Sequence, residues 1–327
     1  MVVCEKYQLK IIGHVADAHS ERIPFCGVCP LCGAWEGAFA CATITTYAFA
    51  EDGSICVSVL GTILKDNFEW RKQVSRLSLF DLVKKSRGAV LSWAWFFIKP
   101  AMYIFCFWFA LEVGLRVGGG GQAEGAPPYL IWLCAGLIPW FFMQEMFGQG
   151  SDVFHRYPYL VNKIKFPIAA IPTIFTGATL IVQLMLQAVL FIIYFLYGQP
   201  LTLYLLQVPL LLVLMFVFWT MFSLMISLLS ALSKDVANLM KALSTPVFWL
   251  SGIIFDMSKI DIPVIQRIMD FNPVTFFAGS FRDAFYDHTW FWENPDKFIG
   301  FIVIFVLTLL VMVLVYRKFN EEVADAL

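Results

Sequence analysis

The chain has 327 residues, of which 60% are hydrophobic and 14% are charged, and it contains 33 Phe and 11 Trp. Its formal net charge of −1 offers no basic surface to nucleic acid, so we predict no nucleic-acid partner. From Phe166 to Ser233 the sequence holds no Asp, Glu, Lys, Arg or His. Apolar runs of about 20 residues fit the roughly 30 Å hydrocarbon layer of a bilayer, which indicates a polytopic helical membrane protein.

Residues 1–60 differ from the rest, because most of the cysteines lie there: Cys4, Cys26, Cys29, Cys32, Cys41 and Cys56. The CxxCxxC spacing of Cys26, Cys29 and Cys32, with Cys41 as a fourth ligand, is compatible with zinc or part of an iron–sulfur cluster. No second CxxC supports such a site. We therefore expect a disordered extension, or sequence translated upstream of the true start, and we assign no metal site.

Residues 61–88 are expected to form a cytoplasmic helix that lies in the membrane interface. Trp70, Val74 and Leu77 recur at helical spacing with basic residues between them. Leu79 falls on another side, which predicts a break after Ser78. An ordinary solvated lead-in helix is the alternative interpretation.

The apolar segments of residues 89–327 predict six transmembrane helices, at about 89–115, 129–146, 168–197, 201–232, 236–255 and 298–316. A short turn at Gly198–Pro200 makes the third and fourth spans an antiparallel hairpin. Residues 256–297 are polar yet rich in aromatic rings, and Asn272 and Pro273 divide them into two short outer helices, re-entrant or gate-like, at headgroup level. The predicted fold class is an all-α polytopic membrane protein.

The basic residues set the expected orientation. Lys and Arg gather before the first span, between the second and third, before the fifth and after the sixth. By the positive-inside rule these segments are cytoplasmic, so both termini lie inside. The residues are Arg71, Lys72, Arg76, Lys84, Lys85, Arg87, Arg156, Lys163, Lys165, Lys234, Arg317 and Lys318.

Motifs of common enzymes are absent from the sequence: it has no Walker A, HExxH or GxSxG pattern. The third and fourth spans also lack the intramembrane carboxylates that mark a proton- or sodium-driven carrier. We therefore assign no catalytic or cofactor-binding residue to this chain and expect the energy source elsewhere.

Five stretches occur in a characteristic order: a basic lead-in that ends at Gly88 and Trp93, AGLIPWFF (135–142), YPYLVNKIKFPIAAIP (157–172), LSKDVANLMKA (232–242) and FNPVTFFAGSFRDAF (271–285). With these stretches the chain resembles the permease subunit of ABC-2 type exporters. It is most similar to the branch that exports lipid-linked polysaccharides, namely O-antigen, capsule or teichoic acid. The resemblance covers residues 66–327.

The resemblance implies a homodimer in the cytoplasmic membrane of a bacterium, with a lipid-linked glycan as cargo. Each permease would bind a separate ABC ATPase chain, which carries the ATP and Mg, so no cofactor is expected on this chain. The ATPase contact would involve the lead-in helix, the loop Ser151–Phe166 and the turn Ser233–Val236. The implied coupling residues are Trp70, Arg71, Arg156, Tyr157, Lys163, Lys165, Lys234 and Asp235.

The resemblance also implies a substrate path lined by the first, second and fifth spans. Aromatic residues there would offer flat apolar surface to sugar rings, although an interfacial aromatic belt has the same composition. The path candidates are Trp93, Trp95, Phe96, Trp132, Trp140, Phe141, Phe248 and Trp249. The outer-gate candidates are Asn272, Pro273, Phe277 and Arg282.

Two alternatives stay open. An ABC-2 exporter of drugs or lipids would share this architecture. A membrane-embedded glycosyl- or acyltransferase would also be rich in aromatic residues, but it needs a cluster of carboxylates or His at one leaflet, and the sequence shows no such cluster.

Overall fold

The computed structural model describes residues 59–87, 92–116, 128–160, 166–256 and 262–326. All regular secondary structure within these ranges is helical, which confirms the all-α fold. Residues 1–58, with their cysteines, lie outside the described ranges, and so do Lys163 and Lys165.

A helical segment at 59–69 precedes α2. The following helices are α2 (Arg71–Ser86), α3 (Trp95–Trp108), α4 (Tyr129–Gly148), α5 (Val153–Arg156), α7 (Ile171–Leu196), α8 (Gln207–Leu232), α9 (Lys234–Leu250), α10 (Pro263–Asp270), α11 (Pro273–Arg282) and α12 (Pro295–Ala326). Two π-helices, Phe109–Gly114 and Asp283–Asp287, extend α3 and α11.

Five helical stretches within the described residues are long and apolar enough to cross a membrane: Trp95–Gly114, Tyr129–Arg156, Ile168–Leu196, Leu203–Leu232 and Pro295–Phe319. They correspond to the predicted first, second, third, fourth and sixth spans. The predicted fifth span coincides with α9, which has 17 residues and carries Lys234, Asp235 and Lys241. By length and charge it differs from the other five.

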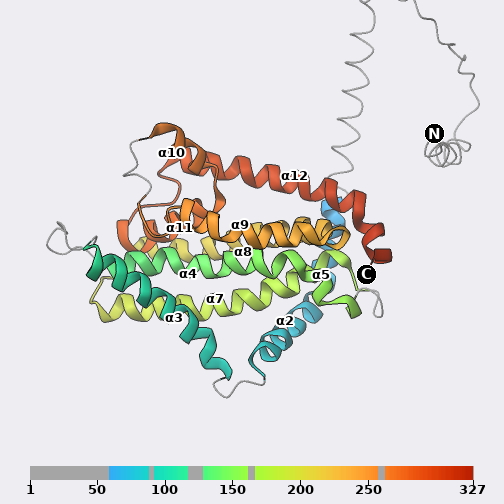
Figure 1. Ribbon diagram of the computed structural model, residues 1–327, viewed down its shortest axis with the longest axis horizontal. Coiled ribbons are helices and arrows are strands. Elements are labelled where there is room, and N and C mark those ends of the chain that lie inside the picture. Colours follow the sequence, from blue (N-terminus) through green and yellow to red (C-terminus); the bar gives the residue numbers. More distant parts are fainter. Residues whose placement is uncertain (1–58, 88–91, 117–127, 161–165, 257–261, 327) are drawn as a thin grey trace, which may run out of the picture. The chain divides into compact units, whose positions relative to one another are not determined.

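Helix α4 occupies the centre of the bundle (Figure 1). It contacts α3, α7, α8, α9 and α11, and most of its residues are buried. In contrast, α3 has no buried residue, although it packs on α4 and its rings contact those of α9. Helices within a bilayer gain little from the hydrophobic effect when they associate, so close packing holds this bundle together.

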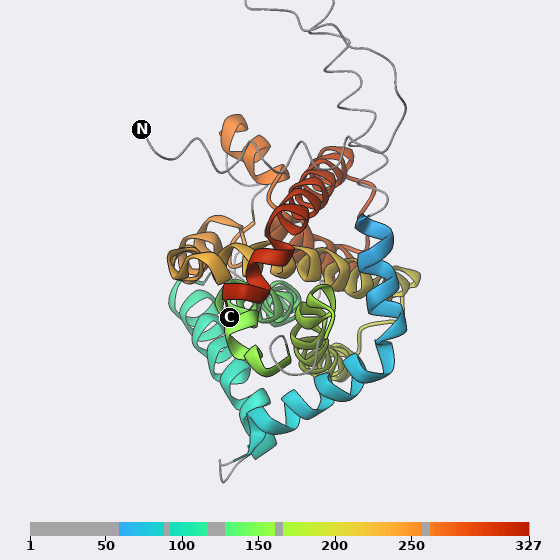
Figure 2. The ribbon, with the colours of Figure 1, turned by 90° about the vertical axis from the view of Figure 1, so that its right-hand side faces the viewer.

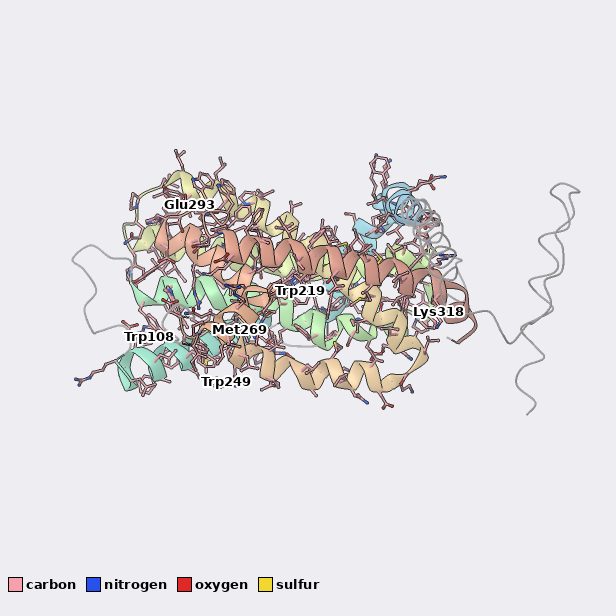
Figure 3. All side chains as sticks on the ribbon, turned by 90° about the horizontal axis from the view of Figure 1, so that it is seen from above. Trp108, Trp219, Trp249, Met269, Glu293 and Lys318 are labelled. Carbon is pink, nitrogen blue, oxygen red and sulfur yellow. The ribbon has the colours of Figure 1, made fainter. Side chains whose placement is uncertain are left out.

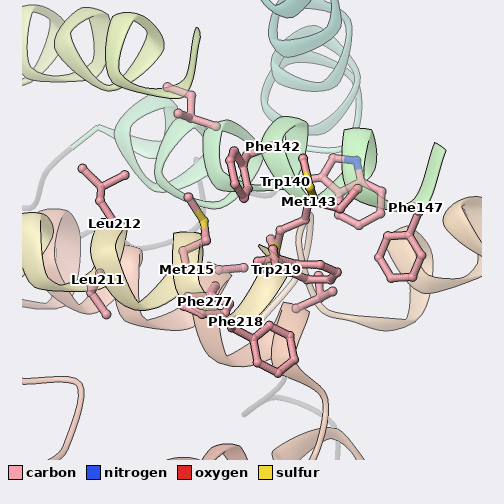
Figure 4. Close-up of a cluster of buried hydrophobic side chains, with 14 of the residues drawn as sticks. Trp140, Phe142, Met143, Phe147, Leu211, Leu212, Met215, Phe218, Trp219 and Phe277 are labelled. Carbon is pink, nitrogen blue, oxygen red and sulfur yellow. The ribbon is translucent and has the colours of Figure 1, made fainter. Parts of the chain in front are cut away.

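Aromatic side chains from α4, α8 and α11 form the core (Figure 4). The rings of Phe147 and Trp219 meet edge to face with centroids 5.3 Å apart, and those of Phe218 and Phe277 are 6.1 Å apart. Trp140 is only 1% exposed. Such ring pairs are worth about 0.5–1.5 kcal/mol each beyond the area they bury, so they fix the relative positions of the three helices.

The two ends of the bundle are built differently. Helices α2 and α5 and the start of α9 gather at one end, the α5 end, while α10, α11 and the start of α12 gather at the other, the α11 end (Figures 1 and 2). Glu293 and Lys318 lie near opposite ends, so α12 runs the length of the bundle (Figure 3). The predicted division at Asn272 and Pro273 is confirmed, because α10 ends at Asp270 and α11 begins at Pro273.

The predicted break after Ser78 is wrong. Helix α2 continues through this residue, and the interruption lies at Trp70, where a turn separates α2 from the segment 59–69. Val74, Ser78, Asp81 and Leu82 are all buried. Their spacing of i, i+4, i+7 and i+8 places them on one face of the helix. Since two of the four are polar, a pattern of apolar residues alone does not reveal this stripe.

Candidate functional site

Hydrogen bonds fasten the lead-in helices to the start of α7, which they pass at the α5 end (Figure 2). Thr173 Oγ1 donates to Asn67 Oδ1 at 2.6 Å, and Ser78 Oγ donates to the carbonyl of Ile174 at 2.9 Å. Gly177 permits this close approach, because a Cβ at that position would lie 2.8 Å from Ser78 Oγ. The lead-in segment is therefore attached to a membrane-spanning helix at more than one point.

The loop around α5 meets α2 through charged and phenolic groups. Arg156 Nη2 lies 3.5 Å from Asp81 Oδ1, and Arg156 Nη1 donates to Gln149 Oε1. Tyr157 is 4% exposed. Burial and the charge of the nearby Asp81 both raise the pKa of the Tyr157 hydroxyl, so it stays protonated at neutral pH.

A second ion pair joins the same loop to α9. Asp152 Oδ1 lies 3.0 Å from His155 Nδ1, and Asp152 Oδ2 lies 3.7 Å from Lys241 Nζ. The side chains of Asp152 and Lys241 are 37% and 49% exposed, so this pair contributes about 0.2–1 kcal/mol. The loop 151–160 is therefore in contact with both α2 and α9.

The predicted coupling residues that the structure describes lie at the α5 end. Trp70 packs edge-on against Phe166, with ring centroids 4.9 Å apart, while Arg156 and Tyr157 belong to the cluster with Asp81. The predicted coupling residues that are exposed are Arg71, Lys234 and Asp235. The α5 end thus combines exposed charges on α2 and α9 with a partly exposed Arg156 between them.

Half of the predicted path residues meet where α3, α4 and α9 adjoin: Trp140, Phe141, Phe248 and Trp249. The ring of Phe248 lies 5.4 Å from that of Trp140 and 5.5 Å from that of Phe107 on α3. Trp249 is 52% exposed, whereas Trp140 is buried. Within one chain, this aromatic cluster is therefore packed at its inner side and open at the Trp249 side.

The other predicted path residues are separated from this cluster. Trp93, just before α3, and Trp95, at its start, are both exposed, and the ring of Trp93 lies 5.8 Å from that of Phe96. Trp132 lies at the α11 end, where its ring is 5.4 Å from that of Tyr129 in a stacked arrangement.

Arg282 joins three elements at the α11 end. It is 7% exposed, and its Nη1 donates to the carbonyl of Gly252 at 2.8 Å. Its Nη2 donates to the carbonyl of Ile253, and its Nε donates to that of Trp132 at 3.3 Å. The guanidinium carbon lies 3.5 Å from the centroid of the Trp132 ring, in a cation–π contact. One side chain thus connects α11 with α4 and with the turn after α9.

Burial lowers the pKa of Arg282 to about 10, which still keeps the guanidinium charged at neutral pH. Gly136 on α4 makes room for it, because a Cβ there would lie 2.9 Å from Arg282 Cζ. The buried charge is therefore accommodated by backbone carbonyls, a ring face and a residue without a side chain.

The remaining gate candidates support the same connection. Asn272 caps the first turn of α11, and its Nδ2 donates to Ser251 Oγ at 2.8 Å in the turn after α9. Pro273 occupies the first position of α11, where no N–H is required. Phe277 is fully buried, and its ring lies 5.3 Å from that of Phe301 on α12. The structure brings all four gate candidates into one packed unit.

Four residues that make contacts at the two ends were not predicted from the sequence: Asp81, Asp152, Lys241 and Ser251. Asp81 did have a signal, since it shares a helical stripe with Val74 and Leu82. Ser251 had none, because its contact with Asn272 depends on how α11 folds back against the end of α9.

Residues 72–286, well over half of the chain, match the family model described as ABC-2 type transporter. The chain therefore belongs to the ABC-2 type transporter family, which confirms the resemblance seen in the sequence. Members of this family are multi-pass membrane subunits of transporters and work with an ABC ATPase. The chain is similar to RfbA of Myxococcus xanthus, an O-antigen export system permease protein, with 18% identity over 266 residues that cover 81% of this chain and 99% of that protein.

Proposed function

We propose that this chain is the permease subunit of an ATP-driven exporter that moves a lipid-linked polysaccharide across the cytoplasmic membrane of a bacterium. The observation that carries the proposal is the similarity to an O-antigen export permease along almost all of that protein's length. O-antigen, capsule and teichoic acid are the glycans that this class of exporter would take.

The α5 end is the proposed contact with a separate ABC ATPase chain, which holds the ATP and Mg. The loop 151–160 touches α2 and α9, so a partner that binds this loop acts on both helices at once. Arg71, Lys234 and Asp235 are exposed there and available to the partner. ATP binding in the partner would bias the permease between two conformations.

The proposal places the α5 end, with its excess of Lys and Arg, in the cytoplasm and makes α9 the fifth of six spans. With 17 residues, α9 is about 26 Å long at 1.5 Å per residue, slightly less than the roughly 30 Å hydrocarbon layer. The turn of residues 251–256 would complete the crossing. Both termini then lie on the cytoplasmic side.

A second copy of the chain would complete the substrate path. Two observations support this arrangement: α3 has no buried residue, and Trp249 of α9 is half exposed beside it. Two copies that face each other through these surfaces would enclose the aromatic cluster of α3, α4 and α9. The unit around Arg282 would close the path on the outer side.

Depletion of this chain in its native bacterium tests the proposal. Surface glycan is oxidised with periodate and labelled with a membrane-impermeant hydrazide, and lipid-linked glycan is extracted and quantified. We expect the surface label to fall while lipid-linked glycan accumulates in the cell. An unchanged surface label contradicts the polysaccharide proposal, and altered drug tolerance or lipid distribution alone supports the drug or lipid exporter. Loss of the glycan altogether indicates a transferase.

A further inference from the structure

Asp81 is a buried carboxylate on a helix whose opposite face is exposed. It is 3% exposed and lies on the stripe of α2 that faces α7, one turn after Ser78. In contrast, its neighbours Leu79 and Phe80 are 50% and 53% exposed. Exposed apolar residues fit a helix that lies on a membrane surface, but that role does not explain a carboxylate buried against the protein.

The groups that lie beside Asp81 come from the loop around α5. Arg156 Nη2 is 3.5 Å from Asp81 Oδ1, and the Tyr157 hydroxyl lies close enough for the carboxylate to raise its pKa. Within the described residues, neither Asp81 Oδ2 nor Tyr157 Oη has a hydrogen-bond partner. The charge of Asp81 also adds to the effect of burial in raising the pKa of Tyr159, from the same loop.

Two cations lie around one aromatic ring beside this carboxylate. Lys85 Nζ is 4.8 Å and Arg156 Cζ is 5.3 Å from the centroid of the Phe175 ring on α7. Lys85 is also close to Glu145 at the end of α4. The cluster therefore combines two positive and two negative side chains and is electrically balanced, so an anionic ligand is not needed to explain it.

The contact between Asp81 and the loop differs from the other attachments of α2. The hydrogen bonds of Asn67, in the segment before α2, and of Ser78, in α2, end on Ala169, Thr173 and Ile174, at or just before the start of α7, and do not reach the loop. They would hold α2 in the fold even without Asp81. An ion pair that is buried on one side only can open, because the Arg156 side chain is 27% exposed and water can replace the carboxylate.

We infer that Asp81 is a positioning residue that ties α2 to the loop 151–160, so that movement of this loop by the ATPase is passed to α2 and to the span that follows it. The inference rests on the proposed function and extends it. Asp81 itself is too buried to touch the partner, so its effect acts through Arg156, whose side chain is 27% exposed. In sequence, α3 begins shortly after α2 ends, which gives the movement a direct route to the proposed path.

The test compares Asp81→Asn with Ser78→Ala, a matched control on the same stripe that removes a bond to α7 and leaves the loop untouched. Both chains are produced in the depleted bacterium. Three quantities are measured: the ABC ATPase that co-purifies with the chain, the ATP hydrolysis rate of that complex, and hydrazide-labelled surface glycan. For Asp81→Asn we expect normal co-purification and hydrolysis with surface glycan at least about fivefold lower, the low end of typical coupling between sites. Ser78→Ala should export normally.

The charge-swapped pair Asp81→Arg with Arg156→Asp provides the rescue. We expect it to export several times more glycan per ATP hydrolysed than either single variant. If Asp81→Asn exports as well as the wild-type chain, the inference is wrong. The inference is also wrong if the single variants fail to accumulate in the membrane and the swapped pair restores the amount of protein without restoring export. Asp81 would then have only a structural role. Failure of the wild-type chain to export would instead contradict the proposed function.

Discussion

Each end of the bundle contains a buried or partly buried guanidinium, and the two are held in different ways. Arg282 donates to three backbone carbonyls and lies on the Trp132 ring. Arg156 pairs with the Asp81 carboxylate and the Gln149 side chain, and it is partly exposed. Backbone carbonyls of packed turns cannot move independently, whereas side-chain partners can rotate and exchange for water. We therefore expect the α11 end to be rigid and the α5 end to be adjustable.

Removal of the Arg282 side chain should have the largest effect. Arg282→Leu leaves three carbonyls without their donor, and each buried unsatisfied group costs about 1–3 kcal/mol. We expect the chain to accumulate poorly in the membrane, as measured by immunoblot of membrane fractions. Arg282→Lys keeps the charge but not the fork of donors, so it should give an intermediate level. Normal accumulation of Arg282→Leu would show that the α11 end does not depend on this residue.

The pH dependence of stability should differ between the ends because of Asp283. Burial raises the pKa of Asp283 to about 7, and the charges of Asp287 and Glu293 add to the effect, while Lys297 and Arg282 oppose it. The folded state then favours the neutral acid, so stability is full at low pH and decreases as the pH rises from about 4 to about 7.

Asp283→Asn should remove this pH dependence. A shift of one pKa unit corresponds to about 1.4 kcal/mol, so Asp283→Asn should raise the free energy of unfolding at pH 8 by at most about 4 kcal/mol. This stabilisation should vanish towards pH 4. The measurement is the midpoint of thermal unfolding in detergent at pH 5 and pH 8. An equal effect of the substitution at both pH values would contradict the assignment.

Adding a single methyl group at Gly136, next to Arg282, should destabilise the folded chain. Gly136→Ala places a Cβ 2.9 Å from Arg282 Cζ, and overpacking of this kind costs about 1–3 kcal/mol. Gly148→Ala is the matched control on the same helix, because a Cβ there meets nothing within 4 Å. Thermal unfolding should distinguish the two variants. If Gly136→Ala is as stable as Gly148→Ala, the guanidinium has room to move and the α11 end is not rigid.

The ion pair between Asp152 and Lys241 should have the smallest effect. Both side chains are substantially exposed, so a double-mutant cycle with Asp152→Asn and Lys241→Met should give a coupling energy of about 0.2–1 kcal/mol. The cycle is measured by chemical or thermal unfolding of the purified chain. A coupling energy well above this range would mean that the α5 end is held as firmly as the α11 end.

Five of the six predicted spans were predictable from the sequence because each is a long apolar run. The division at Asn272 and Pro273 was predictable because a capping residue and a proline mark a helix start. The continuous α2 was not predictable from apolar spacing, since Ser78 and Asp81 occupy its buried face. Their burial depends on hydrogen bonds and charges supplied by residues far away in the sequence.

The candidate gate illustrates the same limit. The sequence placed Arg282 in the outer segment, but its acceptors are carbonyls of Trp132, Gly252 and Ile253. Every residue has a backbone carbonyl, so no sequence pattern indicates which carbonyls a buried guanidinium will reach. Likewise, Trp140 is packed inside the core and Trp249 is exposed, although both are tryptophans near the same aromatic cluster.

Glycan transfer in proteoliposomes tests the central claim most directly. The chain is purified with its co-purifying ATPase and reconstituted with the lipid-linked glycan of the native bacterium, and exposure of the glycan on the opposite leaflet is followed with the impermeant hydrazide. The account predicts transfer that requires ATP hydrolysis and stops with a non-hydrolysable ATP analogue. Transfer at the same rate without ATP, or no transfer by a complex that hydrolyses ATP, would contradict it.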